Sequence, residues 1–162
     1  MNDNIVNEAK RIETDALFSF KGCFNAAASW DKIYLRLGCF VAVTSVIAGS
    51  IVLSDILNEG DIIAAFMALG SGMLAAVSTF LEPQKKANIF RKSGADYKYL
   101  RDRARTLYEV KAKTDITIEN LIIDLEALQQ VSYQLSKDSP VIPNWAFRTA
   151  RKGIDSGEAD YD

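Results

Sequence analysis

The fold is decided by two uncharged apolar stretches, LGCFVAVTSVIAGSIVLS (residues 37–54) and IIAAFMALGSGMLAAVSTFL (residues 62–81). They contain 18 and 20 residues. At about 1.5 Å rise per residue, each forms a helix roughly 27–30 Å long, which is the thickness of the hydrocarbon core of a bilayer. A helix of a soluble protein keeps a polar face, and neither stretch has one. Because only residues 55–61 (DILNEGD) separate them, the sequence predicts a helical hairpin that spans a membrane.

The basic residues predict the orientation of this hairpin, whose spans we place at about residues 37–57 and 62–81. The bridge between the spans has no Lys or Arg. Basic residues precede the first span and follow the second: Lys21, Lys32, Arg36, Lys85, Lys86, Arg91, Lys92, Lys98 and Arg101. The positive-inside rule then places both termini in the cytosol and the acidic bridge outside. We expect a multi-pass protein of the bacterial inner (cytoplasmic) membrane.

Composition excludes several classes of protein. With 162 residues the chain forms one domain, and a net charge of −2 does not favour a nucleic-acid binder. The chain has no His, no paired Cys and no Gly-x-Ser-x-Gly motif, so we predict no enzymatic activity, no cofactor and no metal site. Cys39 lies inside an apolar stretch, which argues against a bridge to Cys23 and favours a reduced, cytosol-facing protein. The first span also begins too late for a signal peptide.

The residues before the first span are predicted to form an amphipathic helix over residues 3–36. Apolar residues recur at spacings of three and four through Ile5, Ala9, Ile12, Ala16 and Phe20. No helix breaker separates this segment from the span, so one long helix that enters the membrane is expected. Near its end, Trp30 and Tyr34 are placed either as headgroup-level anchors or as ordinary packing residues against a neighbouring helix.

Glu82-Pro83 ends or kinks the second span, and three further helices are predicted at residues 84–112, 117–137 and 144–152. Their apolar positions form two seams at three-four spacing, which suggest an antiparallel pair. The seam residues are Phe90, Tyr97, Leu100, Ala104, Leu107, Leu121, Leu125, Leu128 and Leu135. Thr117 is expected to cap the helix over residues 117–137, and Gly153 to end the last helix. The single domain then covers residues 1–153, followed by an acidic, disordered tail over residues 154–162.

A recognisable pattern follows the second span. It comprises Phe80-Leu81, Ala87, Phe90-Arg91, Ala95, Tyr97, Leu100-Arg101, Arg105 and, further on, Pro140-x-x-Pro143. Together with the two-span hairpin, this arrangement resembles the SLATT family over roughly residues 30–153. These are two-transmembrane proteins with a cytosolic helical extension, found beside SLOG-type sensors and nucleotide-second-messenger synthetases of bacterial defence systems. This chain carries Phe90 where relatives often have a His.

The resemblance implies an antiphage or abortive-infection effector that oligomerises and forms a pore or disrupts the inner membrane. It also implies that the trigger comes from a genetically linked sensor or a second-messenger synthetase. Membrane lipid and further copies of the chain are then the other expected partners, and nucleic acid is not.

Two ridges of small residues are candidate packing surfaces within the membrane. They are Gly38, Ala42, Ser45 and Gly49 in the first span, and Ala64, Ala68, Gly72 and Ala76 in the second. Lipid is as apolar as Leu, so spans associate through close backbone approach, which small residues permit. Either both ridges only close the hairpin on itself, or one ridge closes the hairpin and another surface contacts neighbouring subunits.

Polar residues in and beside the spans are candidates for a pore. The hydroxyls at Thr44, Ser50, Ser54, Ser71, Ser78 and Thr79 either line a pore or bond to carbonyls of their own helix. Asp55, Glu59 and Asp61 either form acidic rings at the outer mouth or simply hydrate the turn. Lys32, Arg36, Lys85, Lys86, Arg91 and Lys92 are expected to face anionic headgroups. Neither span contains an ionisable residue, so conduction would be passive.

Three other functions remain open from the sequence alone. One is a constitutive small ion channel or transporter subunit, which the lack of charge within the spans makes less attractive. Another is a non-conducting anchor or scaffold whose cytosolic helices recruit a soluble partner. A soluble protein that hides the hairpin until it is triggered is disfavoured, because each remaining helix has a single apolar face.

Overall fold

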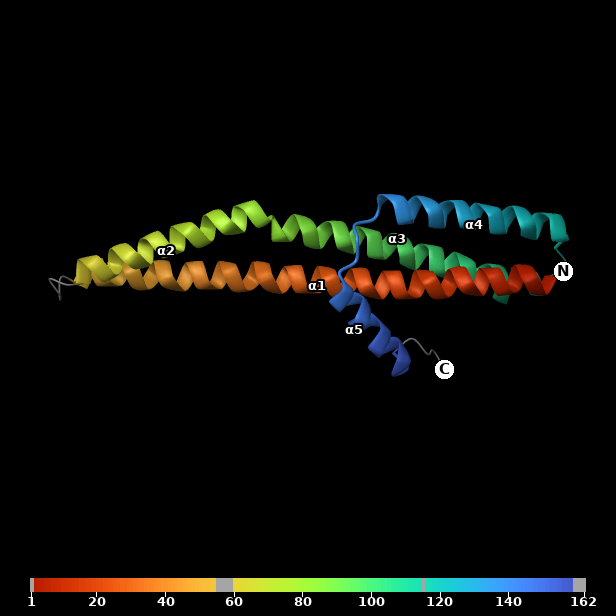
Figure 1. Cartoon of the computed structure of the whole chain (residues 1–162), viewed down its shortest axis with the longest axis horizontal. Helices are drawn as coiled ribbons and strands as arrows, with labels where there is room; N and C mark the ends of the chain where they lie inside the picture. Colours follow the sequence, from red (N-terminus) through yellow and green to blue (C-terminus); the bar gives the residue numbers. More distant parts are fainter. Residues whose placement is uncertain (1, 55–59, 115, 159–162) are drawn as a thin grey trace. The chain divides into compact units, whose positions relative to one another are not determined.

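The computed structural model describes residues 2–54, 60–114 and 116–158, and all the regular elements in these ranges are helices (Figure 1). The predicted all-α class is therefore confirmed. In chain order the elements are α1 (Asn2–Ser54), α2 (Gly60–Leu81), α3 (Pro83–Glu109), the short 3-10 helix η1 (Lys111–Lys113), α4 (Ile118–Asp138) and α5 (Asn144–Asp155).

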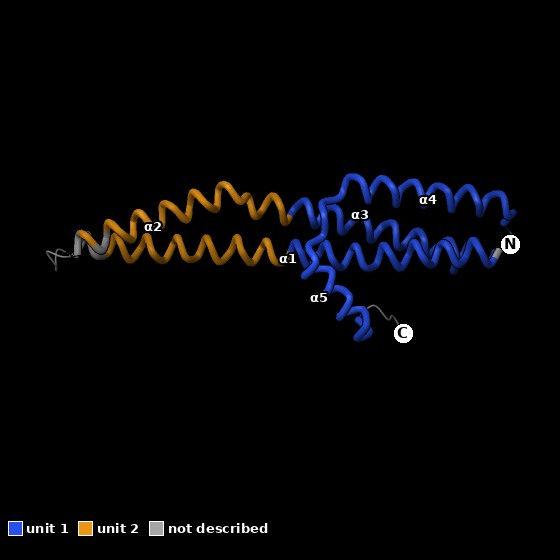
Figure 2. The backbone as a smooth tube through the Cα atoms, viewed as in Figure 1, with its two compact units in different colours: residues 1–27, 88–162 blue, residues 28–87 orange. Residues whose placement is uncertain are grey.

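The chain forms two compact units, which Figure 2 shows in different colours. Unit 1 consists of residues 1–27 and 88–162, and unit 2 consists of residues 28–87. Because α1 is continuous over Asn2–Ser54, its first half belongs to unit 1 and its second half to unit 2. The first predicted span and the predicted amphipathic segment are thus parts of a single helix.

Unit 1 is built on the pairing of α1 with α3. The buried positions of α1 in this unit include Ile5, Ala9, Ile12, Ala16 and Cys23, and those of α3 include Phe90, Ser93, Tyr97, Leu100, Ala104 and Leu107. Both sets follow three-four spacing, so each helix buries one stripe of small and large side chains. Glu13 contacts Arg101, whereas Cys23 and Phe24 lie against Gly94. Since the α1 numbers rise as the α3 numbers fall, the two helices are antiparallel.

α4 covers this pair in unit 1 and runs antiparallel to α3. Leu107 and Leu128 line one cavity, together with the ion pair between Lys111 and Asp124. Leu121 and Leu128 are buried, and the other two seam residues of α4, Leu125 and Leu135, are half-buried. Thr117 stands at the N-cap as predicted, but its side chain makes no capping hydrogen bond. The Thr117 carbonyl accepts from the Leu121 N–H, which is the first backbone hydrogen bond of the helix.

α5 extends further than predicted, and the start of the predicted disordered tail is structured. The helix continues through Gly153 to Asp155, and Gly157 adopts a φ of 88°, a conformation that favours glycine. Glu158 accepts a hydrogen bond from Lys21 at 3.0 Å. The last helix therefore ends at Asp155 rather than at residue 152, because the residue with positive φ lies at Gly157 and not at Gly153. Residues 159–162 of the predicted tail lie outside the described residues.

Unit 2 contains the second half of α1, all of α2 and the first turn of α3, with the two long helices side by side (Figure 2). Along α1, partial or full burial recurs at Leu37, Val41, Thr44 and Ala48. Along α2, it recurs at Met67, Ser71, Leu74, Ser78 and Leu81. This three-four spacing marks the faces that the two helices turn toward each other. Most other described positions of the two apolar stretches are exposed.

The helix break predicted at Glu82-Pro83 occurs at Glu82. α2 ends at Leu81, α3 begins at Pro83, and Glu82 has a φ of 42°. Among the described residues, no other non-glycine residue has a positive φ. A left-handed conformation costs a residue with a Cβ about 1–2 kcal/mol, so the joint between α2 and α3 is strained. Glu82 is held there by its carbonyl, which accepts from the Lys86 N–H, and by an ion pair with Lys85.

Candidate functional site

Unit 2 has an extensive exposed apolar surface. Phe40, Val46, Phe66, Leu69 and Met73 are all more than half exposed. Two helices of the chain are long and apolar enough to cross a membrane, and only 6% and 0% of their most apolar windows are buried. A core helix of a soluble protein is mostly buried by its own fold. These helices are not, so their outer surface requires an apolar environment other than the described chain.

Both predicted ridges of small residues lie on this outer surface where the structure describes their side chains. Gly38, Ala42, Ser45 and Gly49 are exposed, and so are Ala68, Gly72 and Ala76, whereas the side chain of Ala64 lies outside the description. A Cβ added at Gly38, Gly49 or Gly72 would have no neighbouring atom within 4 Å. The ridges therefore do not close the pair of helices. The faces that α1 and α2 turn toward each other use other residues: Leu37, Val41, Thr44 and Ala48 on α1, each one position before a ridge residue, and Met67, Ser71, Leu74 and Ser78 on α2.

The predicted pore hydroxyls bond to their own helices. The side chains of Thr44, Ser50, Ser71 and Thr79 each donate to a carbonyl three or four residues earlier, at 2.9–3.1 Å. Thr44, Ser71 and Ser78 are also half-buried on the mutual faces of α1 and α2, while Ser50 and Thr79 are exposed. Ser54 is the last residue of α1, and its side chain is not described. The alternative of local side-chain bonding is thus what the structure contains at four of these positions.

The charged residues predicted beside the spans have different surroundings and do not form a single cluster where the structure describes them. Asp55 and Glu59 lie outside the described residues, and Asp61 falls in the first turn of α2. Lys32, Arg36 and Lys92 are exposed, Lys85 pairs with Glu82, and Arg91 donates to the Asn88 side chain. Lys86 contacts an aromatic ring, which the sequence did not predict. Its Nζ lies 4.6 Å from the centre of the Trp30 ring, a cation–π contact within unit 2.

Trp30 is half-buried beneath Lys86. Packing against the start of α3 is therefore the role that the structure gives this ring, of the two left open by the sequence. Tyr34, the other aromatic residue of that pair, is 46% exposed.

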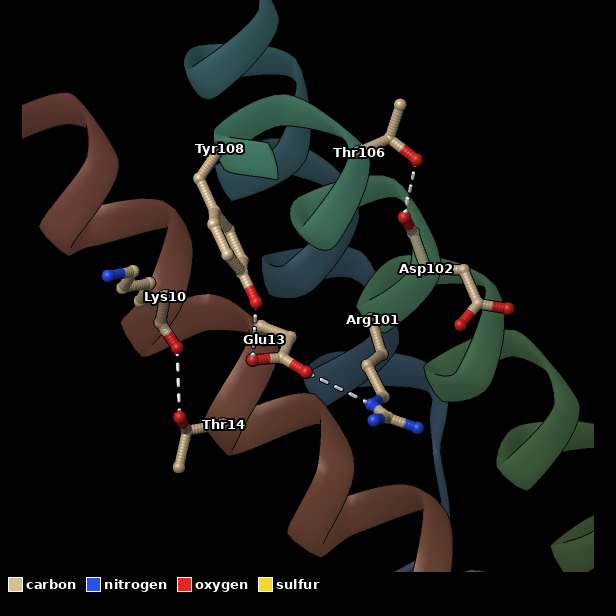
Figure 3. Close-up of polar contacts among 7 residues, drawn as sticks. All are labelled: Lys10, Glu13, Thr14, Arg101, Asp102, Thr106 and Tyr108. Carbon is tan, nitrogen blue, oxygen red and sulfur yellow. Dashed lines mark hydrogen bonds and ion pairs between the residues drawn. The ribbon is translucent and has the colours of Figure 1, made fainter. Parts of the chain in front are cut away.

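A polar cluster ties α1 to α3 inside unit 1 (Figure 3). Arg101 donates from Nε to Glu13 Oε1 at 3.1 Å, and the Tyr108 hydroxyl donates to Glu13 Oε2 at 3.3 Å. The Lys10 ammonium lies 5.6 Å from the centre of the Tyr108 ring. The Arg101 and Glu13 side chains are only 7% and 17% exposed, so this is a mostly buried ion pair. Such a pair favours one register of the two helices, because sliding one helix along the other would leave a buried charge without its partner.

Burial also changes the acid–base chemistry of unit 1. Desolvation raises the pKa of Tyr108, and the nearby negative charges of Glu13 and Glu109 raise it further. Desolvation raises the pKa of the Cys23 thiol from 9.0 to about 11. Because the thiolate is the reactive form, Cys23 is an inert core residue at neutral pH. Both Cys23 and Cys39 are free thiols.

A small cavity lies where α3, η1 and α4 meet in unit 1. It encloses about 90 Å³ and is lined by Arg103, Thr106, Leu107, Lys111, Asp124 and Leu128. The Lys111 ammonium and the Asp124 carboxylate are 2.6 Å apart beside it, so its main charges neutralise each other. Within the described residues, no three His, Cys, Asp or Glu side chains gather in a way that could hold a metal ion. This cavity is a packing feature rather than a binding site.

Sequence reasoning missed two sets of residues. The mutual faces of α1 and α2 escaped notice because a helix that is apolar all round carries no signal of which side is covered. The partnership of Glu13 with Arg101 was missed as well. Its signal was present, since Glu13 and Arg101 each adjoin a seam residue, Ile12 and Leu100.

The fold and this surface define an all-helical protein with two helices long and apolar enough to span a membrane. No known protein family matches the chain, and neither a curated relative nor a solved structure matches it.

Proposed function

We propose that this protein is a membrane effector of a bacterial defence system. In this proposal α1 and α2 form a two-span hairpin in the inner membrane, with both termini and unit 1 in the cytosol. A partner sensor or a nucleotide signal triggers copies of the chain to associate and permeabilise the membrane. The resemblance to the SLATT family supports the biological setting, and the asymmetry of basic residues supports the orientation.

One observation carries the association step: the small-residue ridges of α1 and α2 face outward. Gly38, Gly49 and Gly72 have open space where a Cβ would stand, while the mutual faces of the helices use other residues. In lipid, apolar area alone does not drive helices together, so close backbone approach at small residues is the main source of affinity. The chain therefore keeps its best association surfaces free for other subunits.

The position of Glu82 supports a role for unit 1 in triggering. The strained residue lies at the end of α2, and the helix that follows it carries the core of unit 1. A signal that moves α3 acts on a joint that already stores strain, which lowers the free energy needed to rearrange the spans.

A non-conducting anchor is the second candidate function. It is favoured by the side-chain bonds of Thr44, Ser50, Ser71 and Thr79, which use their hydroxyl hydrogens within their own helices. Hydroxyls bonded in this way offer fewer donors to a water-filled pore. In this case unit 1 would recruit a soluble partner to the membrane, and the spans would only hold it there.

Inducible expression of the full chain tests these alternatives. The gene is expressed in bacteria with and without its genomic neighbours, during phage challenge, and a membrane-potential dye and growth are followed. Depolarisation and growth arrest that require the neighbours and the challenge support the effector. Leakage from the chain alone indicates a constitutive channel, and a retained potential with partner recruitment indicates an anchor. Recovery of the chain in the supernatant after detergent-free lysis and high-speed centrifugation contradicts all three membrane functions.

A further inference from the structure

The helix α5 has an outward face of unusual composition. Arg148, Arg151 and Lys152 are all exposed, at spacings of three and one, on the side opposite the buried Ala146 and Ala150. Since 100° separates successive residues of a helix, these three basic side chains lie within one quadrant-sized arc of the helix surface. The face is therefore cationic, while the small residues behind it hold the helix against unit 1.

Apolar side chains lie beside this cationic face. Trp145, at the start of α5, is 48% exposed, and Val141, just before the helix, is 91% exposed. Of the large apolar side chains that the structure describes, only Phe80 is more exposed than Val141. Exposed aromatic and aliphatic groups next to Lys and Arg are typical of segments that lie in the interface of a membrane, where rings sit at headgroup level and basic groups meet phosphates.

The cationic charge of this face is not neutralised within the described residues. Arg151 pairs with Asp155 at 3.8 Å, and both side chains are more than 60% exposed, so solvent screens the contact. Neither Arg148 nor Lys152 has an ion-pair partner in residues 2–54, 60–114 and 116–158. The face thus presents a net positive charge to its surroundings.

The rest of α5 is fixed to the part of α1 that precedes the first apolar stretch. Phe147 stacks on Phe18 with ring centres 5.9 Å apart, and the Asn25 side chain donates to the Ala146 carbonyl. A Cβ at Gly22 would lie 3.0 Å from Ile142. Only eleven residues of sequence separate Asn25 from Leu37, the first residue of the apolar stretch. The cationic face is therefore attached close in sequence to the segment that enters the membrane.

From these observations we infer that α5 binds the anionic phospholipid headgroups of the membrane that α1 and α2 cross. The inference rests on the membrane insertion in the proposed function, and it adds a third membrane contact outside the spans. Arg148, Arg151 and Lys152 pair with lipid phosphates, and Trp145 and Val141 enter the headgroup layer. Nucleic acid fits this face less well, because the exposed Trp145 and Val141 beside the basic residues match the apolar part of a membrane interface.

Tryptophan fluorescence of the full chain tests this inference. The chain has two tryptophans, so Trp30→Tyr leaves Trp145 as its single reporter and keeps an aromatic ring under Lys86. The variant is reconstituted into phosphatidylcholine vesicles with or without about one third phosphatidylglycerol, together with lipid brominated near the headgroup end of its chains. We expect quenching of Trp145 in the anionic vesicles, little quenching in the neutral ones, and loss of quenching in about 0.5 M NaCl.

Charge reversal supplies the matched comparison. Each basic residue near an anionic surface changes the bound-to-free ratio by about fivefold, so removal of the three positive charges lowers it by about 100-fold, and their reversal lowers it further. The test variant carries Arg148→Glu, Arg151→Glu and Lys152→Glu. The control variant carries the same charge change at exposed basic residues elsewhere in unit 1: Arg11→Glu, Lys98→Glu and Arg105→Glu. Only the test variant should lose quenching.

Three outcomes overturn the inference. These are an unquenched Trp145 in anionic vesicles, equal quenching in neutral and anionic vesicles, and equal effects of the test and control variants. Flotation of the vesicles separates this failure from failure of the proposed function. If the chain floats with the vesicles but Trp145 is not quenched, α5 does not bind lipid although the spans insert. If the chain does not float, the proposed membrane function itself fails.

Discussion

Gly94 lies at a close approach of α3 to α1. A Cβ at this position would lie 2.9 Å from the Phe24 ring and 3.3 Å from Cys23 Cβ. Gly94→Val therefore overpacks the helix pair, and we expect it to lower the free energy of unfolding by about 1–3 kcal/mol. Denaturant unfolding in detergent micelles, followed by circular dichroism, measures this change.

Ala95→Val is the matched control for Gly94→Val, because Ala95 is an exposed neighbour on the same helix. It introduces the same β-branched side chain without overpacking and should cost only about 0.5 kcal/mol. Phe24→Ala should relieve most of the cost of Gly94→Val, since it removes the ring that the new methyl groups meet. Equal losses of unfolding free energy for Gly94→Val and Ala95→Val would show that the contact between α1 and α3 accommodates the larger side chain at Gly94.

Tyr108 gives unit 1 an alkaline limit of stability. Desolvation, followed by the charges of Glu13 and Glu109, raises the pKa of Tyr108 above its ordinary value of 10.0. The folded state thus holds the phenolic proton more tightly than the unfolded state does. The resulting stabilisation is complete below about pH 10 and is lost as pH rises through the folded-state pKa.

We expect Tyr108→Phe to reduce the fall in stability above pH 10, because it removes the titrating group. At neutral pH the same substitution should cost about 1 kcal/mol, the hydrogen bond to Glu13. Thermal unfolding of both proteins between pH 8 and about pH 11 separates the two effects. Parallel curves across that range would mean that Tyr108 does not contribute to the alkaline loss.

At the scale of elements, the mostly buried pair of Arg101 and Glu13 sets the register of α1 against α3. Arg101→Met leaves the Glu13 carboxylate, 17% exposed, without this cation, and we expect a loss of about 2–4 kcal/mol. The double change Glu13→Leu with Arg101→Met should cost less than Arg101→Met alone, because no unpaired charge remains. Unfolding in detergent micelles measures both.

The ion pair of Lys113 with Glu109 is the control for this buried pair. Its side chains are 68% and 44% exposed and screened by solvent, so Lys113→Met should change the free energy of unfolding much less than Arg101→Met does. If Arg101→Met costs no more than Lys113→Met, the pair of Arg101 and Glu13 has no part in setting the register.

The elements themselves were predictable to different degrees from the sequence. The stripe of α3 through Phe90, Tyr97 and Leu100 could be read because polar residues fill the rest of that helix. The end of α5 could not, because two glycines, Gly153 and Gly157, were equally suited to stop it. Tertiary contacts selected Gly157, since the pair of Lys21 with Glu158 holds the chain beyond Gly153 in place.

At the scale of the whole molecule, the sequence could not predict which face of each apolar helix packs against the other helix and which face is exposed. Gly72 and Ser71 are adjacent, and the apolar pattern treats them alike, yet Ser71 lies half-buried toward α1 and Gly72 lies exposed. A helix that is apolar on all sides gains nearly the same free energy whichever side is covered. The shape of the side chains then decides which side packs against the other helix. In unit 2 the mutual faces contain Leu37, Val41 and Leu74 together with the smaller Thr44, Ala48, Ser71 and Ser78, whereas the described residues of the two small-residue ridges lie outside.

This division of faces leads to a prediction about assembly. Gly70 and Gly72 both lie on α2, both are exposed, and a Cβ at either would meet no atom within 4 Å. Only Gly72 belongs to the ridge with Ala68 and Ala76. Gly72→Leu should therefore block close approach of a second copy and raise the dissociation constant of the oligomer about tenfold, equivalent to about 1.4 kcal/mol. Gly70→Leu should leave the oligomer unchanged.

Size-exclusion chromatography with light scattering, in detergent micelles, gives the oligomer mass of each variant over a range of concentrations. Circular dichroism should show that both variants fold, because both positions are exposed and a Cβ at either meets no other atom within 4 Å. If depolarisation requires the oligomer, Gly72→Leu should also suppress it in cells, and Gly70→Leu should not. Equal masses for the two variants at every concentration would show that the ridge faces lipid. The small residues would then be tolerated there rather than used for assembly.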